Sequence, residues 1–560
     1  MIVRRLAAAR RPPFGHLPQG TLSATMGETA QAERLRSREL AAARAWAQAH
    51  WFGLGIAAIA LPAAAFLVHQ LLAWPPHEDE ALPLFLGRHP LGDLFQVVLE
   101  ERGGAPLHFL LAWAVAHLGL GLEGLRLLSA AFAVGSLPVV ALLLARLAGP
   151  ARALLATAVV ATSWTFLFHG IYGRMYSLFL FTSALSFLAL LHAVDRGGRR
   201  AWGLWAAAIL ATVATHPYGA LVLAAQGTYV LVARRERLRA AMRAFGVVAV
   251  LGIPFWLTDL VLAGRFDAGV GAGGRLDLAD YLWQVAGDFT AGFPVLPAVL
   301  VAAAAGAAAL PRDARALAAC AAVVPLAALV LTRSSGSPET RHLIFLLPFV
   351  ALAVGAGLAR LGRTWAPAAL AALVVAQVAW TWDRTPELFE WEPDARQEAR
   401  AEAAAHIAAV TDHDDVLLGY DPLFLQAWEL DDDFPLVALP RADADLALHS
   451  LLALERPLGH GVWVLDASKT TNAVRSLEIP LTSPRPAAAL ETRVFGPFLV
   501  IRTRHPVVTP KRYLERAGQA MLVGKRLYLG DADINLPTIE RAARALRGYG
   551  AARSLSTSSR

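Results

Sequence analysis

Long apolar runs separated by short charged connections fill most of the first two thirds of the chain. A transmembrane helix needs about 20 mostly apolar residues to cross about 30 Å of hydrocarbon. The pattern therefore predicts an all-α polytopic membrane protein with about 11–13 transmembrane helices. The candidate spans lie near residues 51–73, 105–122, 125–147, 152–170, 172–194, 201–216, 217–233, 240–263, 290–310, 314–332, 341–359 and 364–382.

The connections between these runs are of two kinds. Arginine-rich connections lie at residues 146–152, 196–200, 234–239, 312–315 and 360–363. Acidic or mixed connections lie at residues 77–101, 264–288 and 334–339 and after residue 383. Because cytoplasmic loops carry an excess of Lys and Arg, the first set is predicted to be cytoplasmic and the second external.

The number of crossings conflicts with this charge pattern if every run spans. Residues 1–49 are basic and contain no apolar run, which predicts a cytoplasmic N-terminal segment without a signal peptide; Met26 is an alternative start. Twelve crossings would then return the C-terminal region to the cytoplasm. Either the run 105–122 lies in part along the interface, or the basic connection 146–152 is external. We expect an odd number of crossings and an external C-terminal domain.

The pattern changes at about residue 386, where the transmembrane domain (residues 50–385) ends. Helix-like stretches and short β-branched runs alternate from there on, as in βαβ units. We expect a small, mostly parallel α/β domain over residues 386–506, and then a helical basic tail with a disordered end over residues 507–560. The helix-like stretches are 396–410 and 443–454, and the strand-like runs are 416–420, 435–439, 462–465 and 498–503.

The composition agrees with a membrane protein. The chain is 56% hydrophobic and 17% charged, whereas soluble proteins carry about 25% charged residues. Its net charge of +7 lies in arginine clusters between spans, which indicates membrane orientation rather than nucleic-acid binding. The single cysteine, Cys320, excludes an intrachain disulfide and a cysteine-based metal or redox site.

The first external connection contains the strongest candidate for chemistry. The sequence His77-Glu78-Asp79-Glu80 directly follows the first span, and residues 91–101 have the pattern of a helix lying in the membrane interface. A solvated acidic flank explains such a cluster equally well. As a functional group, a carboxylate here could take a proton from an acceptor hydroxyl as general base. The cluster could also bind a hard divalent cation through oxygen.

Cationic and aromatic residues at span ends form a second candidate group. Taken singly, each is expected to be a snorkelling arginine or a packed histidine. Charged groups at membrane depth are nevertheless costly and usually functional. Their convergence on the face of the acidic cluster favours a pocket for a phosphate group on a lipid in the bilayer. The residues are Arg126, Tyr172, Arg174, His216, Tyr218, Arg341 and His342.

Several short motifs, taken together in their order and spacing over residues 50–385, resemble a known family. They are Asp79-Glu80-Ala81, Pro106-Leu107-His108, Arg126–Ser129, Arg174–Tyr176, His216–Gly219 and Arg341–Pro348. The chain resembles the GT-C superfamily of glycosyltransferases that use polyprenyl-phosphate sugars. Within it, the resemblance is to the family of protein O-mannosyltransferases and bacterial lipid A aminoarabinose transferases.

Two departures from this family stand out. Relatives commonly carry His-Pro-Pro-Leu where this chain has Gly104-Ala105-Pro106-Leu107. They also often carry Glu-Ala-Arg-Met-Tyr where this chain has Tyr172-Gly173-Arg174-Met175-Tyr176. The missing glutamate puts in doubt any metal site or acceptor contact that used it, and Glu78 or His77 is a candidate replacement.

The resemblance implies a plasma-membrane transferase that moves a monosaccharide, with inversion, from a polyprenyl-phosphate donor to an external protein, glycan or glycolipid. Asp79 would be the general base, and Glu80 would position the acceptor or a cation. Arg174, Arg341, His216 and Arg126 would bind the donor phosphate. The residues left for acceptor or cation contacts are His77, Glu78, Tyr172, Tyr218 and His342. No cofactor is implied beyond an optional divalent cation, and the sugar, the acceptor and the oligomeric state stay open.

Two other classes of protein share part of this pattern. A transporter or lipid flippase would place ionisable residues in the middle of spans, often at broken helices and internal repeats. Here the only such residue is Asp259, which lies near one end of its run, and the sequence has no internal repeat. A scaffold with an external sensory domain would not need an acidic cluster at the membrane surface.

Overall fold

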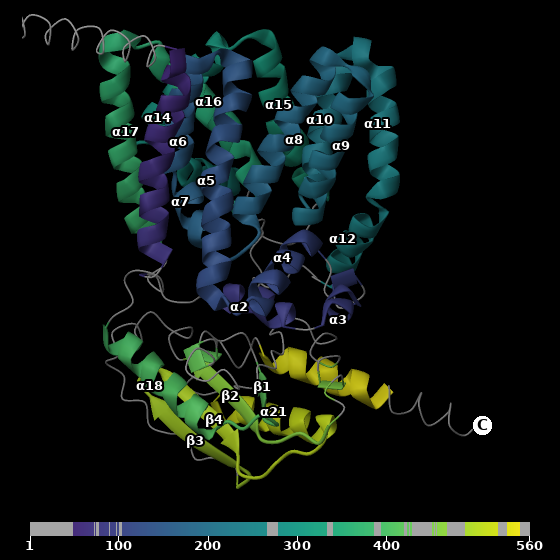
Figure 1. Ribbon diagram of the computed structural model, residues 1–560. Helices are drawn as coiled ribbons and strands as arrows, with labels where there is room; N and C mark the ends of the chain where they lie inside the picture. Colours follow the sequence, from purple (N-terminus) through teal and green to yellow (C-terminus); the bar gives the residue numbers. More distant parts are fainter. Residues whose placement is uncertain are drawn as a thin grey trace, which may run out of the picture. The chain divides into compact units, whose positions relative to one another are not determined.

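The computed structural model describes residues 49–71, 78–88, 90–96, 104–265, 278–332, 340–385, 394–418, 456–466, 488–524 and 535–548, with a few single positions between them (Figure 1). Contacts divide the chain into two units, Met1–Ala57 and Ala58–Arg560. Only the start of the helix Ala49–Leu71 belongs to the described part of the first unit. All other described elements belong to the second unit.

Helices make up the described residues before Thr385, which confirms the predicted all-α membrane part. In chain order they are α2 (Glu78–Gly87), α3 (Leu91–Gln96), α4 (Pro106–His117), α5 (Gly121–Ala148), α6 (Pro150–Thr162), α7 (Trp164–Ile171), α8 (Tyr176–Arg196), α9 (Gly198–Thr215), α10 (Gly219–Ala233), η2 (Arg235–Arg237), α11 (Leu238–Leu251), α12 (Ile253–Arg265), α13 (Leu278–Phe289), α14 (Leu296–Ala309), α15 (Arg312–Thr332), η3 (Thr340–Leu346), α16 (Leu347–Ala359) and α17 (Gly362–Arg384).

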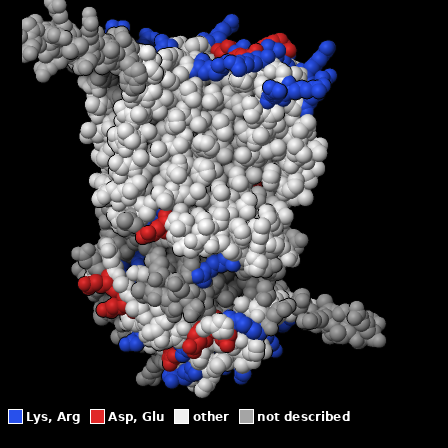
Figure 2. Space-filling view, in the orientation of Figure 1, with Lys and Arg blue, Asp and Glu red and all other residues white. Residues whose placement is uncertain are grey.

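Among the described residues, 5 helices are long and apolar enough to cross a membrane, or up to 7 if each of two bent pairs is one span. The pair α6 and α7 is bent by 56°, and the pair formed by η2–α11 and α12 by 59°. Shorter apolar helices accompany them, namely α4, α10 and α14. On the face seen in Figure 2, a broad uncharged band covers this bundle, and most of the Lys and Arg of the bundle lie at one end, beside a few Asp and Glu.

Helix α4 bears on the first of the two explanations for the number of crossings. Its 12 residues extend about 18 Å at 1.5 Å per residue, too short for about 30 Å of hydrocarbon. It packs against α2, and Leu84 of α2 shares an apolar cluster with Ala112 of α4 and Leu122 of α5. The run 105–122 is therefore too short to cross as a helix, in agreement with the first of the two explanations.

The predicted cytoplasmic connections lie together at the opposite end of the bundle. Arg146 at the end of α5 pairs with Asp195 at the end of α8. Arg237 of η2 donates to the carbonyl oxygens of Val194 and Asp195 at 2.8 and 3.1 Å. Exposed pairs of this kind add only about 0–1 kcal/mol to stability. These contacts nevertheless show that the connection after α5, the connection after α8 and η2 lie together at one end of the bundle.

Helices α14 and α16 approach so closely that glycine is required between them. A Cβ added to Gly306 would lie 1.8 Å from the carbonyl oxygen of Ala353 and 2.5 Å from the nitrogen of Gly357. A Cβ on Gly357 would likewise lie 2.0 Å from the carbonyl oxygen of Ala302. Small residues that let helix backbones approach are a common basis of packing within membranes.

We expect Gly306→Ala to destabilise the protein by about 1–3 kcal/mol, the usual cost of overpacking a closely packed site. The matched control is Gly246→Ala in α11, where a Cβ meets nothing within 4 Å. There alanine should be neutral or slightly stabilising, because it favours a helix over glycine. The measurement is the apparent melting temperature of each variant in detergent. Equal melting temperatures for the two would contradict this packing.

The C-terminal region contains a 4-stranded sheet of order β1-β2-β4-β3. Its strands are β1 (Val416–Leu418), β2 (Gly461–Asp466), β3 (Leu490–Phe495) and β4 (Phe498–Thr503). Only β1 and β2 are parallel; β4 is antiparallel to both β2 and β3. The expectation of a mostly parallel sheet was therefore wrong, because the chain returns from β3 to β4 through a tight hairpin instead of a helical crossover.

Both faces of the central strand are covered. Trp463 and Leu465 of β2 lie in one apolar cluster with Tyr513 of α21 (Pro510–Gly524). Val462 and Val464 point to the other face and share a cluster with residues of α18 (Asp394–Val410). This alternation follows from the two-residue period of a strand. Two helices on opposite faces of a mixed sheet make the region α/β, as predicted (Figure 1).

The other predicted C-terminal elements have mixed outcomes. The strands expected at 416–420, 462–465 and 498–503 correspond to β1, β2 and β4, and the helix expected at 396–410 corresponds to α18. Strand β3 was not predicted. The strand-like run 435–439, most of the stretch 443–454 and the end of the tail lie outside the described residues.

Candidate functional site

Glu80 and Arg126 form a buried ion pair between α2 and α5. Arg126 Nε donates to Glu80 Oε1 at 2.9 Å and Nη2 donates to Oε2 at 2.6 Å. The Glu80 side chain is 0% exposed and that of Arg126 is 3% exposed. Nη1 of Arg126 also donates to the carbonyl oxygen of Leu71 at 3.2 Å. One guanidinium thus joins the end of the first helix, α2 and α5.

This pairing gives Arg126 a buried carboxylate partner that the sequence did not predict. The expected role of Arg126 at the donor phosphate stays a prediction. The two residues lie 46 positions apart, and we had expected them to have separate roles. Together they hold the start of α2 in place.

Gly173 brings the connection between α7 and α8 against this ion pair. Its backbone N–H donates to Glu80 Oε1 at 2.8 Å. A Cβ on Gly173 would lie 3.2 Å from that oxygen and 3.0 Å from Leu125 Cδ2, which is tighter than ordinary contact. This chain therefore has glycine, where relatives often have alanine, at a position where the backbone closely approaches the Glu80 carboxylate.

A group of histidines and tyrosines lies beside this connection. The rings of His216 and His342 are 5.2 Å apart, and Tyr218 lies 5.2 Å from His342. Tyr176, the first residue of α8, is 5.9 Å from His216 and 6.1 Å from His342. The connections before α8 and before α10, together with η3, therefore meet at one place.

Two arginines supply positive charge to this group. Arg341 Cζ lies 5.1 Å from the ring centroid of Tyr176 and 5.9 Å from that of Tyr172. Arg174 and Arg341 both interact electrostatically with His216 and His342. A guanidinium held over an aromatic ring keeps its charge and its planar set of donors. We call the group of Tyr172, Arg174, Tyr176, His216, Tyr218, Arg341 and His342 the cationic cluster.

Some buried nitrogen atoms of this region have no hydrogen-bond partner among the described residues. They are Nδ1 of His342 and both ring nitrogens of His169 in α7, whose residue is 1% exposed. Buried polar atoms in folded proteins are almost always hydrogen-bonded. These nitrogen atoms and the two arginines could therefore form hydrogen bonds to a polar, anionic group.

Three residues beside the cluster or behind it were not predicted from the sequence. His108 of α4 makes a hydrogen bond to the backbone of Gly173 and interacts electrostatically with Arg174. His169 lies against the ring of Tyr176 at 4.9 Å. Asp288 of α13 accepts from Thr340 Oγ1 at 2.7 Å and from Arg384 Nε at 2.9 Å. Because Thr340 precedes Arg341, this carboxylate fixes the start of η3.

The acidic cluster of the sequence is only partly described. Glu78 and Asp79 form the start of α2, directly before Glu80. Their side chains and the whole of His77 lie outside the described residues. Among the residues that the structure does describe, no group of three His, Cys, Asp or Glu could hold a metal ion. A cation bound through His77, Glu78 or Asp79 stays a prediction.

Neither the known protein families nor the curated protein sequences give a match to this chain. Solved structures do. ArnT from Cupriavidus metallidurans in the apo state matches with a TM-score of 0.56 and 17% identity, over 81% of this chain and 98% of ArnT. ArnT bound to undecaprenyl phosphate matches with a TM-score of 0.52 and 16% identity over the same shares. This chain has the ArnT fold.

The ArnT fold is that of a GT-C transferase, so the GT-C-like fold expected from the motifs is confirmed. The match covers nearly all of ArnT and hence more than an isolated bundle of helices. An oligosaccharyltransferase from Archaeoglobus fulgidus, in complex with zinc and sulfate, also matches, with a TM-score of 0.47 and 11% identity over 74% of this chain and 68% of that chain.

Proposed function

We propose that this protein is a membrane glycosyltransferase that takes a monosaccharide from a polyprenyl-phosphate donor. The observation that supports this best is the cationic cluster, which places Arg174 and Arg341 among buried histidines and tyrosines. The ArnT fold adds to it, since ArnT has been solved with undecaprenyl phosphate bound. The cluster is a positively charged and partly desolvated site, which suits a lipid phosphate of the same kind.

The chemistry follows from the charge that develops during transfer. An acceptor hydroxyl attacks the anomeric carbon from the face opposite the phosphate, and the bond from that carbon to the phosphate oxygen breaks. The configuration is inverted and the polyprenyl phosphate leaves with the bonding electrons. Fixed cations lower the barrier where negative charge grows on the leaving group. Arg174 and Arg341 are the residues we assign to this task, with His216 and His342 as further contacts.

Asp79 is the residue we assign as general base. It is the neighbour of Glu80, whose carboxylate is held both by Arg126 and by the N–H of Gly173. These contacts bring the start of α2 to the connection that carries Arg174. A base must lie within hydrogen-bond reach of the hydroxyl it deprotonates. The buried ion pair thus positions the base relative to the phosphate-binding cations.

The orientation in the membrane is part of the proposal. The basic connections meet at one end of the bundle, and the cationic cluster lies at the other ends of α8 and α9 (Figures 1 and 2). Positively charged connections favour the cytoplasm. The cluster and the C-terminal domain would therefore be external, at a plasma membrane, where a protein, glycan or glycolipid could serve as acceptor.

Binding of the donor lipid tests the role of the cluster. Native mass spectrometry of the purified protein with undecaprenyl phosphate should show one bound lipid. Arg341→Gln should bind it at least about tenfold more weakly, because hydrogen bonds to charged groups contribute about 1.5–3 kcal/mol. The control is Arg363→Gln, an exposed arginine of α17 in the basic connection 360–363. Equal binding by the wild type and Arg341→Gln would contradict the assignment.

A transporter remains the second candidate because of one observation. The two bent helix pairs, at 56° and 59°, are the kind of broken helix that transporters use at their substrate sites. The break between α6 and α7 lies at Ser163, whose hydroxyl accepts from Phe166 N at 3.3 Å and caps α7. A capped, ordered break is compatible with the fixed binding site of a transferase and with the moving site of a transporter. Turnover of the donor distinguishes a transferase from a transporter.

A further inference from the structure

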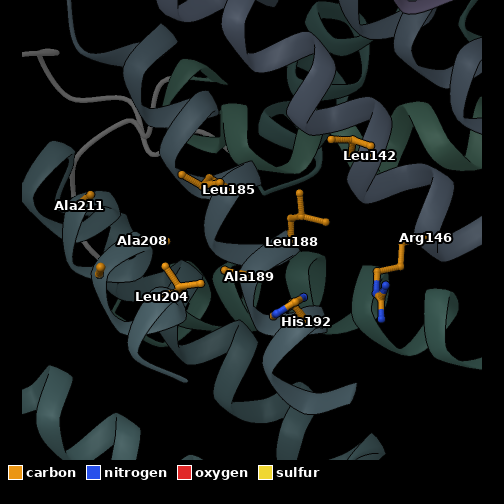
Figure 3. A pocket seen from close by; sticks show the side chains of 10 residues that line it. Leu142, Arg146, Leu185, Leu188, Ala189, His192, Leu204, Ala208 and Ala211 are labelled. Atoms are coloured by element: carbon orange, nitrogen blue, oxygen red, sulfur yellow. The ribbon is translucent and has the colours of Figure 1, made fainter. Parts of the chain in front are cut away.

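Side chains of α5, α8 and α9 line an open groove (Figure 3). Its volume is about 670 Å³, which lies within the range of about 300–1,000 Å³ typical of ligand-binding pockets. Three helices and ten side chains line it. They are Leu142, Arg146, Leu185, Leu188, Ala189, His192, Leu204, Ala207, Ala208 and Ala211.

The walls of the groove are suited to a hydrocarbon chain. Helix α8 packs against both α5 and α9, and α9 contributes mainly alanines, whose small side chains leave the space open. Leu142 and Leu204 on the two flanking helices are 50% and 63% exposed. An open apolar groove with exposed leucines on a membrane bundle is suited to part of a lipid molecule.

One end of the groove is polar. Arg146 lies in the last turn of α5, and His192 lies near the end of α8. Figure 3 shows both side chains on the same side of the groove, apart from Leu185 and Ala211. Arg146 donates to Asp195, and among the described residues its guanidinium makes no other hydrogen bond. Four further N–H donors belong to such a group.

The surroundings of this end carry a net positive charge. The end of α8 carries Asp195 and Arg196, and the first turn of α9 carries Arg199 and Arg200. The start of α9 adds the positive end of a helix dipole. A basic rim at the mouth of an apolar groove is complementary to an anionic headgroup with a hydrocarbon tail.

We propose that the groove binds one acyl chain of an anionic phospholipid, with the lipid phosphate beside Arg146 and His192. The lipid belongs to the leaflet at the basic end of the bundle. This site is separate from the donor site, because His192 follows Tyr176 of the cationic cluster by 16 positions of α8, or about 24 Å along the helix. The proposal therefore does not depend on glycosyl transfer.

Lipid retention by the full-length protein tests this site. The protein is placed in detergent with equal amounts of phosphatidylglycerol and phosphatidylcholine that carry the same acyl chains, and bound lipids are counted by native mass spectrometry. The wild type should retain one phosphatidylglycerol with at least a tenfold preference. Arg146→Gln should lose that preference. Ala207→Phe, which fills the groove from an exposed position of α9, should lose the retained lipid altogether.

Two controls keep the result specific. Arg363→Gln removes an exposed arginine from another basic connection, and Ala368→Phe adds a ring at an exposed alanine of α17. Both should retain lipid as the wild type does. Equal retention of the two lipids by the wild type would overturn the proposal, and so would unchanged retention in Ala207→Phe. A change from dimer to monomer in Ala207→Phe without loss of lipid would also overturn it, because a second copy of the chain would then cover the groove.

Discussion

Asp79→Asn should slow sugar transfer by about 10²–10⁴-fold, the usual contribution of a general base, and should leave the fold intact. The carboxylate would take the proton of the acceptor hydroxyl as the hydroxyl attacks, and an amide cannot do so. Donor binding should persist, because the cationic cluster is unchanged. The measurement is the rate of donor consumption in membranes or nanodiscs, together with the binding of undecaprenyl phosphate.

The control for this variant is Glu123→Gln. Glu123 is an exposed acidic residue in the first turn of α5, three positions before Arg126, and its loss should leave the rate unchanged. An Asp79→Asn protein that is well folded, binds the donor and turns over at the wild-type rate would remove Asp79 from the mechanism. Binding and turnover that fail together would show that Asp79 acts on the donor and not on the acceptor.

Glu80→Gln should destabilise the protein strongly, by about 3–5 kcal/mol, because it leaves the charge of Arg126 buried without its partner. The pair is bidentate and almost wholly buried. Three segments depend on it, since Arg126 also holds the carbonyl of Leu71 and Glu80 also holds the N–H of Gly173. The expected result is a large fall in the apparent melting temperature and in the yield of folded protein.

The double variant Glu80→Gln/Arg126→Gln distinguishes the effect of an unpaired buried charge from the effect of lost side-chain packing. It removes both charges, so no uncompensated charge is buried, and part of the lost stability should return. The control is Asp313→Asn, which breaks an ion pair at an exposed carboxylate worth about 0–1 kcal/mol. A Glu80→Gln protein as stable as the wild type would contradict the structural role of the pair.

The helical part of the fold could largely be predicted from the sequence, because hydrophobic length alone identifies most membrane helices. The one ambiguous run, 105–122, was decided by its glycines. Gly119 and Gly121 both have positive φ, 70° and 55°, which β-carbon-bearing residues rarely adopt. They end α4 after 12 residues and start α5 in a new direction. An apolar run that contains such glycines should be treated as two elements.

The small sheet was harder to predict for a physical reason. Strand β3 places charged residues at Glu491 and Arg493, so it lacks a continuous apolar run, and its pairing with β4 depends on the Gly496-Pro497 turn, with φ of 49° at Gly496. Helical connections between strands favour parallel pairing. Strands β3 and β4 follow each other directly in the chain without a helix between them, so they pair antiparallel.

The site shows what motifs can and cannot provide. The resemblance named the arginines and histidines that the structure brings together from three distant connections. It could not show that Arg126 pairs with Glu80, because the two are far apart in sequence and their charges suggested separate tasks. His108, His169 and Asp288 were missed because a single polar residue on an apolar helix face is usually a packing residue. Only the fold shows that the two histidines lie beside the cluster and that Asp288 binds Thr340, the residue before Arg341.

Donor turnover separates a transferase from a transporter in one experiment. The full-length protein in nanodiscs is given a polyprenyl-phosphate-linked sugar together with a membrane extract that contains acceptors, and the lipids are followed by mass spectrometry. We predict that the wild type converts the donor to polyprenyl phosphate and that the sugar mass appears on an acceptor, whereas Asp79→Asn does neither. A donor that stays chemically intact while it moves from one leaflet to the other in sealed vesicles would contradict sugar transfer and identify a transporter.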